Sequence, residues 1–172
     1  SFDIEIKSNP IIYINDETNG EEAVCKGEIF NLTASGNDNS NYTWYRSEMK
    51  DGNEIEGANG EVYSPTINNT EKYVVKGENT FGCLGSAVFT VKAKEYPTFT
   101  ANDTTSCKGM PSTVKVKTGN AEYYTWTWHN NGKQESINGT SYSEILTATR
   151  TYQLTGTKEG CTTTPITVTA NV

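Results

Sequence analysis

The sequence predicts an all-β chain made of two tandem copies of one β-sandwich module, and three observations lead to this prediction. Thr, Asn, Tyr, Val and Gly are abundant, whereas runs of the helix-favouring residues Ala and Leu are missing. A set of landmark residues occurs twice in the same order. Apolar and polar residues alternate along short segments that are bounded by turn-forming residues, which is typical of half-buried strands.

The internal repeat is clearest around the cysteines and tryptophans. Cys25 and Cys107 are each followed by Lys-Gly, and a tryptophan, Trp44 or Trp126, lies 19 residues after each of them. Each tryptophan closes a Tyr-Thr-Trp sequence. The remaining paired landmarks are Tyr63 and Tyr142, Tyr73 and Tyr152, Gly77 and Gly156, and Cys83 and Cys161. This repetition indicates a duplicated module.

The repeat predicts two domains, residues 8–95 and 96–172, with a very short linker at Glu95-Tyr96-Pro97. Residues 1–7 resemble the end of the first copy, so we interpret them as the last strand of a preceding repeat or as a leader. Because the chain starts at Ser1 rather than Met, we expect it to be a piece of a longer tandem array.

The alternating segments predict the central strands of each copy. We expect them at residues 30–34, 42–44, 73–75 and 89–93, and again at 114–116, 124–126, 152–154 and 166–170. Short strands at regular spacing, separated by turns, predict an immunoglobulin-like sandwich of two sheets. Trp44 and Trp126 share the parity of neighbouring apolar residues, so we expect them in the core with Tyr73 and Tyr152.

Three aromatic residues are candidates for a ligand-binding surface. Trp128 occupies the position that Arg46 has in the first copy, which makes it the best candidate for a surface aromatic among the tryptophans, although packing at a sheet edge is the favoured alternative. Tyr45 and Tyr123 are the other candidates for contact with a glycan. His129 is the only histidine, and we expect it to be an exposed turn residue.

Several motifs resemble a known repeat. Residues 25–27 (Cys-Lys-Gly), 31–36 (Asn-Leu-Thr-Ala-Ser-Gly) and 42–44 (Tyr-Thr-Trp) resemble the bacterial immunoglobulin-like (PKD-like) repeat of Bacteroidetes surface proteins, and residues 151–157 with Gly160-Cys161 resemble its final hairpin. The resemblance implies a segment of an adhesin or gliding-associated protein exported by type IX secretion. The second cysteine lies nine or ten residues after the strand tyrosine, unlike in antibody domains, where the gap is two.

The four cysteines, two per copy, indicate disulfides in an oxidising compartment. Pairing within copies, Cys25–Cys83 and Cys107–Cys161, is one alternative. However, we expect Cys25 at the start of the second strand and Cys83 just past the end of the sixth, separated by about eight residues at about 3.3 Å each, whereas a disulfide needs Cα atoms within about 7 Å. This favours a bond between domains, Cys25–Cys161, with Cys83 and Cys107 bonded to flanking repeats.

Composition and motifs argue against several function classes. The net charge of −7 and pI near 4.8 exclude binding of nucleic acid through a basic face. No apolar run approaches the roughly 20 residues that cross a bilayer. No zinc cluster or catalytic Cys-His pair is evident, so we expect no enzyme and no cofactor. Acidic loops at 37–39 and at Asp51, Glu54 and Glu56 are where calcium would bind, but they lack the spacing of a calcium loop.

These observations lead to one functional prediction and one alternative. We expect a non-catalytic spacer or adhesive segment of an extracellular cell-surface protein, with loops 46–60 and 128–139 contacting glycans or host proteins. The alternative is a glycan-binding accessory module of a secreted enzyme. Asp103-Thr104-Thr105 resembles an O-glycosylation signal of Bacteroidetes, which makes Thr104 a candidate for modification.

Overall fold

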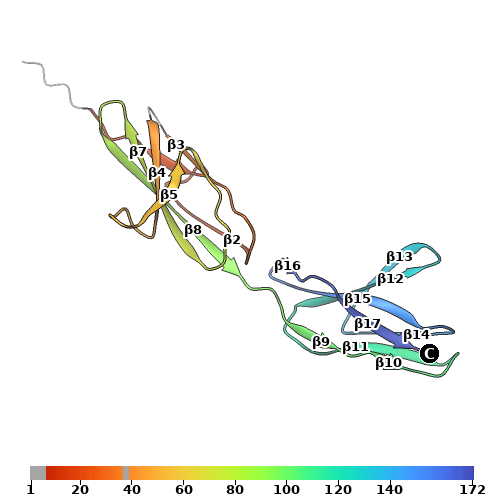
Figure 1. Cartoon of the computed structure of the whole chain (residues 1–172). Coiled ribbons are helices and arrows are strands. Elements are labelled where there is room, and N and C mark those ends of the chain that lie inside the picture. Colours follow the sequence, from red (N-terminus) through yellow and green to blue (C-terminus); the bar gives the residue numbers. More distant parts are fainter. Residues whose placement is uncertain (1–6, 37–38) are drawn as a thin grey trace, which may run out of the picture. The chain divides into compact units, whose positions relative to one another are not determined.

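The computed structural model describes residues 7–36 and 39–172 (Figure 1). The described residues form strands, turns and loops, and no helix that could span a membrane is found among them. The chain divides into two compact units, Ser1–Lys94 and Glu95–Val172, here called domain 1 and domain 2. The segment 1–7 and the acidic loop 37–39, apart from residues 7 and 39, lie outside the described residues.

Domain 1 consists of two sheets (Figure 1). The smaller sheet has the order β1 (Ile12–Ile14), β3 (Leu32–Gly36), β6 (Val62–Tyr63). The larger sheet has the order β2 (Asn19–Cys25), β8 (Leu84–Lys94), β7 (Glu71–Asn79), β4 (Asn39–Arg46), β5 (Glu54–Asn59).

Domain 2 repeats this arrangement. Its smaller sheet has the order β14 (Ser141–Ile145), β11 (Pro111–Gly119), β9 (Phe99–Ala101). Its larger sheet has the order β10 (Thr104–Thr105), β17 (Ile166–Asn171), β15 (Arg150–Lys158), β12 (Tyr123–Asn130), β13 (Lys133–Asn138), and β16 (Cys161–Thr162) pairs with β15.

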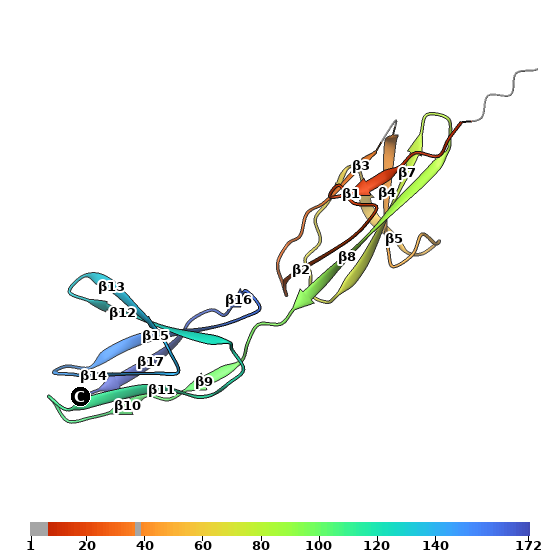
Figure 2. The ribbon, with the colours of Figure 1, turned by 180° about the vertical axis from the view of Figure 1, so that it is seen from behind.

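The first strand of each domain is divided between the two sheets, as Figure 2 shows for β1 and β2. In domain 1, β1 pairs antiparallel with β3, and the chain then crosses to the other sheet, where β2 pairs parallel with β8. Asn15 and Asp16, with φ of 50° and 67°, form the bend between β1 and β2. In domain 2, β9 pairs with β11 and β10 pairs parallel with β17. The two tandem immunoglobulin-like sandwiches predicted from the sequence are therefore confirmed.

This divided strand corrects one expectation. Cys25 is the last residue of β2, opposite Lys94 of β8, and does not start the following strand. The sequence pattern did not reveal β2, because only Gly20 and Cys25 of its seven residues are buried and no period-two alternation results.

A tryptophan occupies the centre of each core. Trp44 on β4 and Trp126 on β12 are 0% exposed, and each of these strands has a hydrogen-bonded neighbour on both sides. The indole Nε1 of Trp44 donates to the carbonyl oxygen of Gly60 at 2.9 Å, and that of Trp126 donates to Gly139 at 2.9 Å. Each indole thus buries a large apolar surface while its one polar group is satisfied.

The accepting glycines have a conformation that side chains disfavour. Gly60 has a φ of 141° and Gly139 a φ of 153°, and each follows the asparagine that ends β5 or β13. Glycine adopts such a φ without a steric penalty. The Asn-Gly pairs therefore bend the chain back toward the core and direct a carbonyl oxygen to the indole.

Tyr73 on β7 and Tyr152 on β15, each 1% exposed, pack in the core beside these tryptophans. In domain 1, Tyr63 lies between them, with its ring centroid 5.9 Å from Trp44 and 5.8 Å from Tyr73. In domain 2, Trp126 meets Tyr152 edge to face at 6.3 Å. The tryptophan, the tyrosine and the satisfied indole nitrogen are features that both cores share.

We expect Trp126→Ala to destabilise domain 2 by about 3–5 kcal/mol, because it removes a fully buried indole and leaves a cavity. Denaturant unfolding followed by NMR, which resolves the two domains, measures this effect. Ile145→Ala is the control, because Ile145 is 66% exposed and its loss should cost less than about 0.5 kcal/mol. Equal effects of the two substitutions would contradict the assigned core.

Candidate functional site

The candidate surface aromatics differ in exposure. Trp128 is 6% exposed, because it follows Tyr124 and Trp126 on the inward face of β12. Its ring stacks on Tyr142, with centroids 4.6 Å apart, and meets Tyr152 edge to face at 5.7 Å. Trp128 is therefore a packed residue, and its candidacy for an exposed ligand-binding surface is wrong. The alternation of side chains along β12 turns Trp128 inward, whereas the side chain of Arg46, its counterpart in domain 1, is exposed.

Tyr45 and Tyr123 also differ from each other in exposure. Tyr45 is 4% exposed and its hydroxyl donates to Glu54 at 3.0 Å, so it offers no free ring face of the kind expected from the sequence. This bond also engages one of the carboxylates considered for calcium. Tyr123, at the start of β12, is 50% exposed and is the one of the three that remains on the surface.

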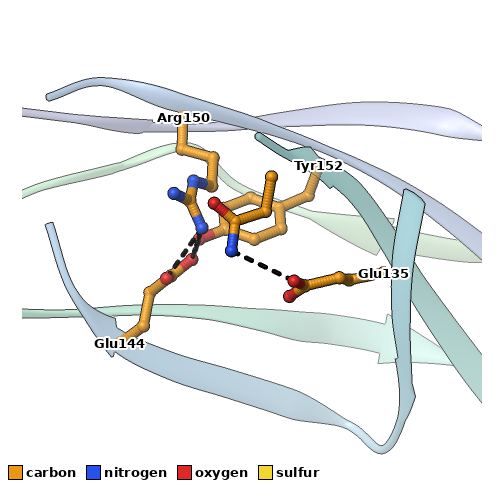
Figure 3. Close-up of polar contacts among 5 residues, drawn as sticks. Glu135, Glu144, Arg150 and Tyr152 are labelled. Carbon is orange, nitrogen blue, oxygen red and sulfur yellow. Dashed lines mark hydrogen bonds and ion pairs between the residues drawn. The ribbon is translucent and has the colours of Figure 1, made fainter. Parts of the chain in front are cut away.

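A cluster of polar side chains joins the two sheets of domain 2 (Figure 3). Glu144 lies on β14 of the smaller sheet, whereas Arg150 and Tyr152 lie on β15 of the larger sheet. Nη1 of Arg150 donates to both carboxylate oxygens of Glu144, at 3.0 and 2.8 Å, and the Tyr152 hydroxyl donates to Oε1 of the same carboxylate. Because the ion pair is only about one-fifth to one-quarter exposed, water screens it less than a surface pair.

Domain 1 has a related cluster with a different origin. The Tyr73 hydroxyl donates to Glu71 at 2.7 Å, and Glu71 lies two residues before Tyr73 on the same strand. Arg46 forms an ion pair with Glu71 at 3.7 Å, and its side chain is 59% exposed. The buried tyrosine is thus common to both domains, whereas the carboxylate comes from the same strand in domain 1 and from the opposite sheet in domain 2.

Burial raises the pKa of Tyr152 well above its ordinary value, and the hydrogen bond to Glu144 raises it further. The pKa of Tyr73 is raised by burial and by its hydrogen bond to Glu71. Ionising either phenol would place a second negative charge beside a carboxylate in a poorly solvated site. Both clusters therefore hold a neutral phenol as a donor and act as structural clamps.

The four cysteines lie at the ends of their domains. Cys25 pairs with Lys94, the last residue of domain 1, whereas Cys83 follows β7 at the opposite end, beside Leu84. About ten residues of β8 separate these two positions, which corresponds to about 33 Å. Cys83 and Cys107 carry free thiols. Each pairing within a copy requires one of these two residues, so neither pairing is formed in this structure.

The two cysteines of domain 2 also lie at opposite ends of their domain. Cys161 pairs with Lys158 at one end of β15, whereas Cys107 follows Ser106, whose backbone N–H donates to Asn171 at the other end of the domain. Cys161 is fully buried and Cys107 is exposed.

The remaining predicted sites are placed as follows. Thr104 is half-buried in the short strand β10, and the Asp103 carboxylate before it accepts the backbone N–H of Thr169 at 2.7 Å. Its glycosylation stays a prediction. His129 is exposed within β12 rather than in a turn. Among the described residues, no three His, Cys, Asp or Glu side chains come together as a metal site would require.

Comparison with known proteins gives structural likeness only. No protein family and no curated protein matches the sequence. Similar solved structures include fibronectin(III)-like modules of CbhA from Clostridium thermocellum, with 13% identity, a TM-score of 0.43 and 94% of each chain covered. The IG1 and IG2 domains of DIP-gamma have 14% identity and a TM-score of 0.38, covering 96% of this chain and 98% of theirs. An I-band fragment of titin has 15% identity and a TM-score of 0.40, covering 93% of this chain and 64% of the fragment. These TM-scores are low, so the fold assignment rests on the strand pairing itself.

We expect Glu144→Gln to destabilise domain 2 by about 1–3 kcal/mol, because it leaves the half-buried Arg150 without a compensating charge. The matched control is Glu71→Gln in domain 1, where the more exposed pair with Arg46 should contribute less than about 1 kcal/mol. Domain-resolved unfolding measures both. A larger loss in domain 1 would contradict the proposed difference between the clamps.

The raised tyrosine pKa values predict a loss of stability in alkali. Unfolded tyrosines ionise near pH 10, whereas folded Tyr73 and Tyr152 keep their protons, so the folded state binds more protons above about pH 10. Their contribution is complete below that pH and is lost as the pH rises above it. Free energies of unfolding measured from about pH 8 to about pH 11 should fall less steeply in domain 2 of Tyr152→Phe. An unchanged slope would exclude this linkage.

Proposed function

We propose that this chain is a non-catalytic spacer segment of a large extracellular surface protein, in which disulfides join immunoglobulin-like modules in series. The observation that carries the proposal is the location of the cysteines at domain ends. Within each domain the two cysteines are too far apart to bond with each other. A cysteine at a domain end is instead suited to bond with a neighbouring module.

The proposed bond in this chain is Cys25–Cys161. Cys25 lies beside Lys94, where the chain leaves domain 1. Cys161 lies at the end of domain 2 where the chain enters. It pairs with Lys158, and the neighbouring Thr157 accepts the backbone N–H of Glu122. Two residues earlier, Asn120 donates its N–H to Thr98, which directly follows the linker. Both cysteines therefore belong to the ends that adjoin the linker.

The repeat extends this proposal to flanking modules. Cys107 is the counterpart of Cys25, and Cys83 is the counterpart of Cys161. If the same bond forms at every junction, the free thiols of Cys83 and Cys107 bond to the corresponding cysteines of a preceding and a following repeat. A disulfide at each junction requires an oxidising compartment outside the cytosol.

The mechanical role follows from two connections at one junction. Four residues, 95–98, join β8 to β9, and a linker this short restricts hinge motion. The disulfide adds a second covalent connection and encloses residues 26–160 in a loop. Tension applied at the two ends of the chain then passes through the disulfide, so the enclosed residues cannot extend.

The resemblance to Bacteroidetes surface repeats supports placing such a spacer in an adhesin or gliding-associated protein exported by type IX secretion. Loops 46–60 and 128–139 are the proposed contacts with glycans or host proteins. The accessory glycan-binding alternative is favoured by one observation, a cleft in domain 2 of about 460 Å³ whose lining includes Trp128, His129 and Gln134 of the second loop.

Peptide mapping of the oxidised chain without reduction is expected to recover a Cys25–Cys161 linked peptide, with Cys83 and Cys107 alkylated as free thiols. Cys25→Ser is the test variant and Cys83→Ser the matched control, because only the first removes the proposed bond. Recovery of a Cys25–Cys83 peptide would contradict the proposal.

Single-molecule stretching provides the mechanical test of the same bond. The oxidised chain should extend only by the residues outside 26–160, and reduction should release the full length of both domains, at about 3.5 Å per residue. Cys25→Ser should extend fully without reductant. Full extension of the oxidised wild-type chain would exclude the disulfide.

A further inference from the structure

Each domain has two ends, and one cysteine lies at each of them. The Cys25 end of domain 1 and the Cys161 end of domain 2 adjoin the linker. The Cys83 end of domain 1 is formed by the turn between β7 and β8, and the Cys107 end of domain 2 contains the C-terminus (Figure 1). Cys83 and Cys107 are the free thiols. Both thiols therefore lie at ends that do not adjoin the linker.

Two large apolar side chains are exposed at the Cys83 end. Phe81 is 62% exposed and Leu84 is 44% exposed, and they flank the half-buried Cys83 in the turn. The Lys7 ammonium lies 4.4 Å from the centroid of the Phe81 ring, so it covers part of the ring and leaves the rest accessible. Single exposed apolar residues are common, but two of them beside a free thiol form a small apolar patch.

Asn79 fixes the conformation of this turn. Its side-chain oxygen accepts the N–H groups of Phe81 and Cys83, at 3.0 and 2.9 Å, and its own N–H donates to the Cys83 carbonyl at 3.0 Å. Its amide nitrogen donates to the Ser8 carbonyl at 3.5 Å, and the residue is only 9% exposed. The turn therefore presents the patch in an ordered form, which lowers the entropic cost of binding a partner.

The Cys107 end also exposes two large apolar side chains. Met110 is 56% exposed and Ile145 is 66% exposed. Met110 donates its backbone N–H to the Cys107 carbonyl at 3.0 Å, and Ile145 is paired with Pro111, the residue after Met110. Both side chains thus belong to the segment around the second free thiol.

The corresponding positions are polar at the ends that adjoin the linker. Counting from the paired cysteines and from Tyr63 and Tyr142 gives four equivalent positions in the two copies. With the apolar residue first, the pairs are Met110 and Glu28, Ile145 and Thr66, Phe81 and Glu159, and Leu84 and Thr162. An apolar end gains more by packing on another apolar end than on a carboxylate, which would have to lose its water. The contrast therefore favours contact between the two apolar ends.

We propose that the Cys83 end of one chain binds the Cys107 end of a second copy, with Phe81 and Leu84 packing against Met110 and Ile145 and a disulfide joining the two thiols. This inference rests on the proposed spacer function, because Cys107 is the counterpart of Cys25 and Cys83 that of Cys161. The junction is heterologous and runs head to tail, so it can repeat along a line of copies. The repeating unit is then the pair of domains, not the single module.

The contact and the disulfide have different roles. Four partly exposed side chains bury well under the about 1,200 Å² of a stable interface, so we expect the apolar contact alone to be weak. It selects which thiols meet, and the disulfide then holds them. Bond formation removes two protons and two electrons from the thiols and requires an oxidant such as a small-molecule disulfide, which is reduced to two thiols.

Coupling between two variants that each keep one of these thiols tests the proposal. Cys107→Ser keeps the Cys83 thiol, and Cys83→Ser keeps the Cys107 thiol. In a mixture with oxidised glutathione, we expect the dimer with a Cys83–Cys107 linked peptide to form about tenfold faster than either homodimer, because only this dimer joins ends of opposite kind, as in the repeat. Digestion without reduction identifies the linked peptides.

Replacing the apolar patch by its polar counterparts tests the contact itself. Phe81→Glu with Leu84→Thr, introduced beside the Cys83 thiol, should slow formation of the mixed dimer by about tenfold or more, because less apolar surface is buried. Val62→Thr is the matched control, because Val62 is 58% exposed but pairs with Thr33 in the smaller sheet, away from both thiols. It should couple like the unsubstituted partner. Unchanged indole NMR signals of Trp44 verify that domain 1 stays folded.

Three results would overturn the proposal: homodimers that form as fast as the mixed dimer, an unaltered rate in the folded Phe81→Glu, Leu84→Thr variant, or an equal loss of rate in Val62→Thr. The same digests show separately whether the Cys25–Cys161 peptide is present. Its absence would contradict the disulfide of the spacer proposal, whereas its presence together with unselective coupling would contradict only this inference.

Discussion

The fold of each domain depends on one buried tryptophan whose indole nitrogen is satisfied by a glycine carbonyl. Trp44 and Trp126 lie on central strands, so their rings contact residues from both sheets of a sandwich. The bond to Gly60 or Gly139 allows the indole to be fully buried, and the positive φ of that glycine turns the chain toward it. The same interaction occurs twice because the module is duplicated.

Around this shared centre the two copies have diverged at the end of the larger sheet. Domain 1 places Arg46 at the surface and takes the carboxylate for its buried tyrosine from the same strand. Domain 2 buries Trp128 instead and takes the carboxylate from the opposite sheet, which positions Arg150 beside an open stretch of the sheet. One scaffold thus supports an acidic copy and a copy with a cleft beside Arg150.

The sequence alone predicted the features that depend on local periodicity and repetition. The two domains, the sandwich and the inward direction of Trp44 and Trp126 follow from alternation along strands. Trp128 stayed a candidate for the surface because comparison with Arg46 conflicts with the parity it shares with Trp126. The strand β2 was missed because few of its residues are buried. The clamp between Glu144 and Tyr152 joins different sheets, and no spacing in the sequence indicates such a contact.

Hydrogen exchange of the indole N–H groups, measured by NMR, tests the central interaction most directly. We expect the Trp44 and Trp126 signals to persist until their domains unfold, because each N–H is buried and bonded to a glycine carbonyl. Exchange of either indole as fast as in an unstructured peptide would contradict this account of the cores.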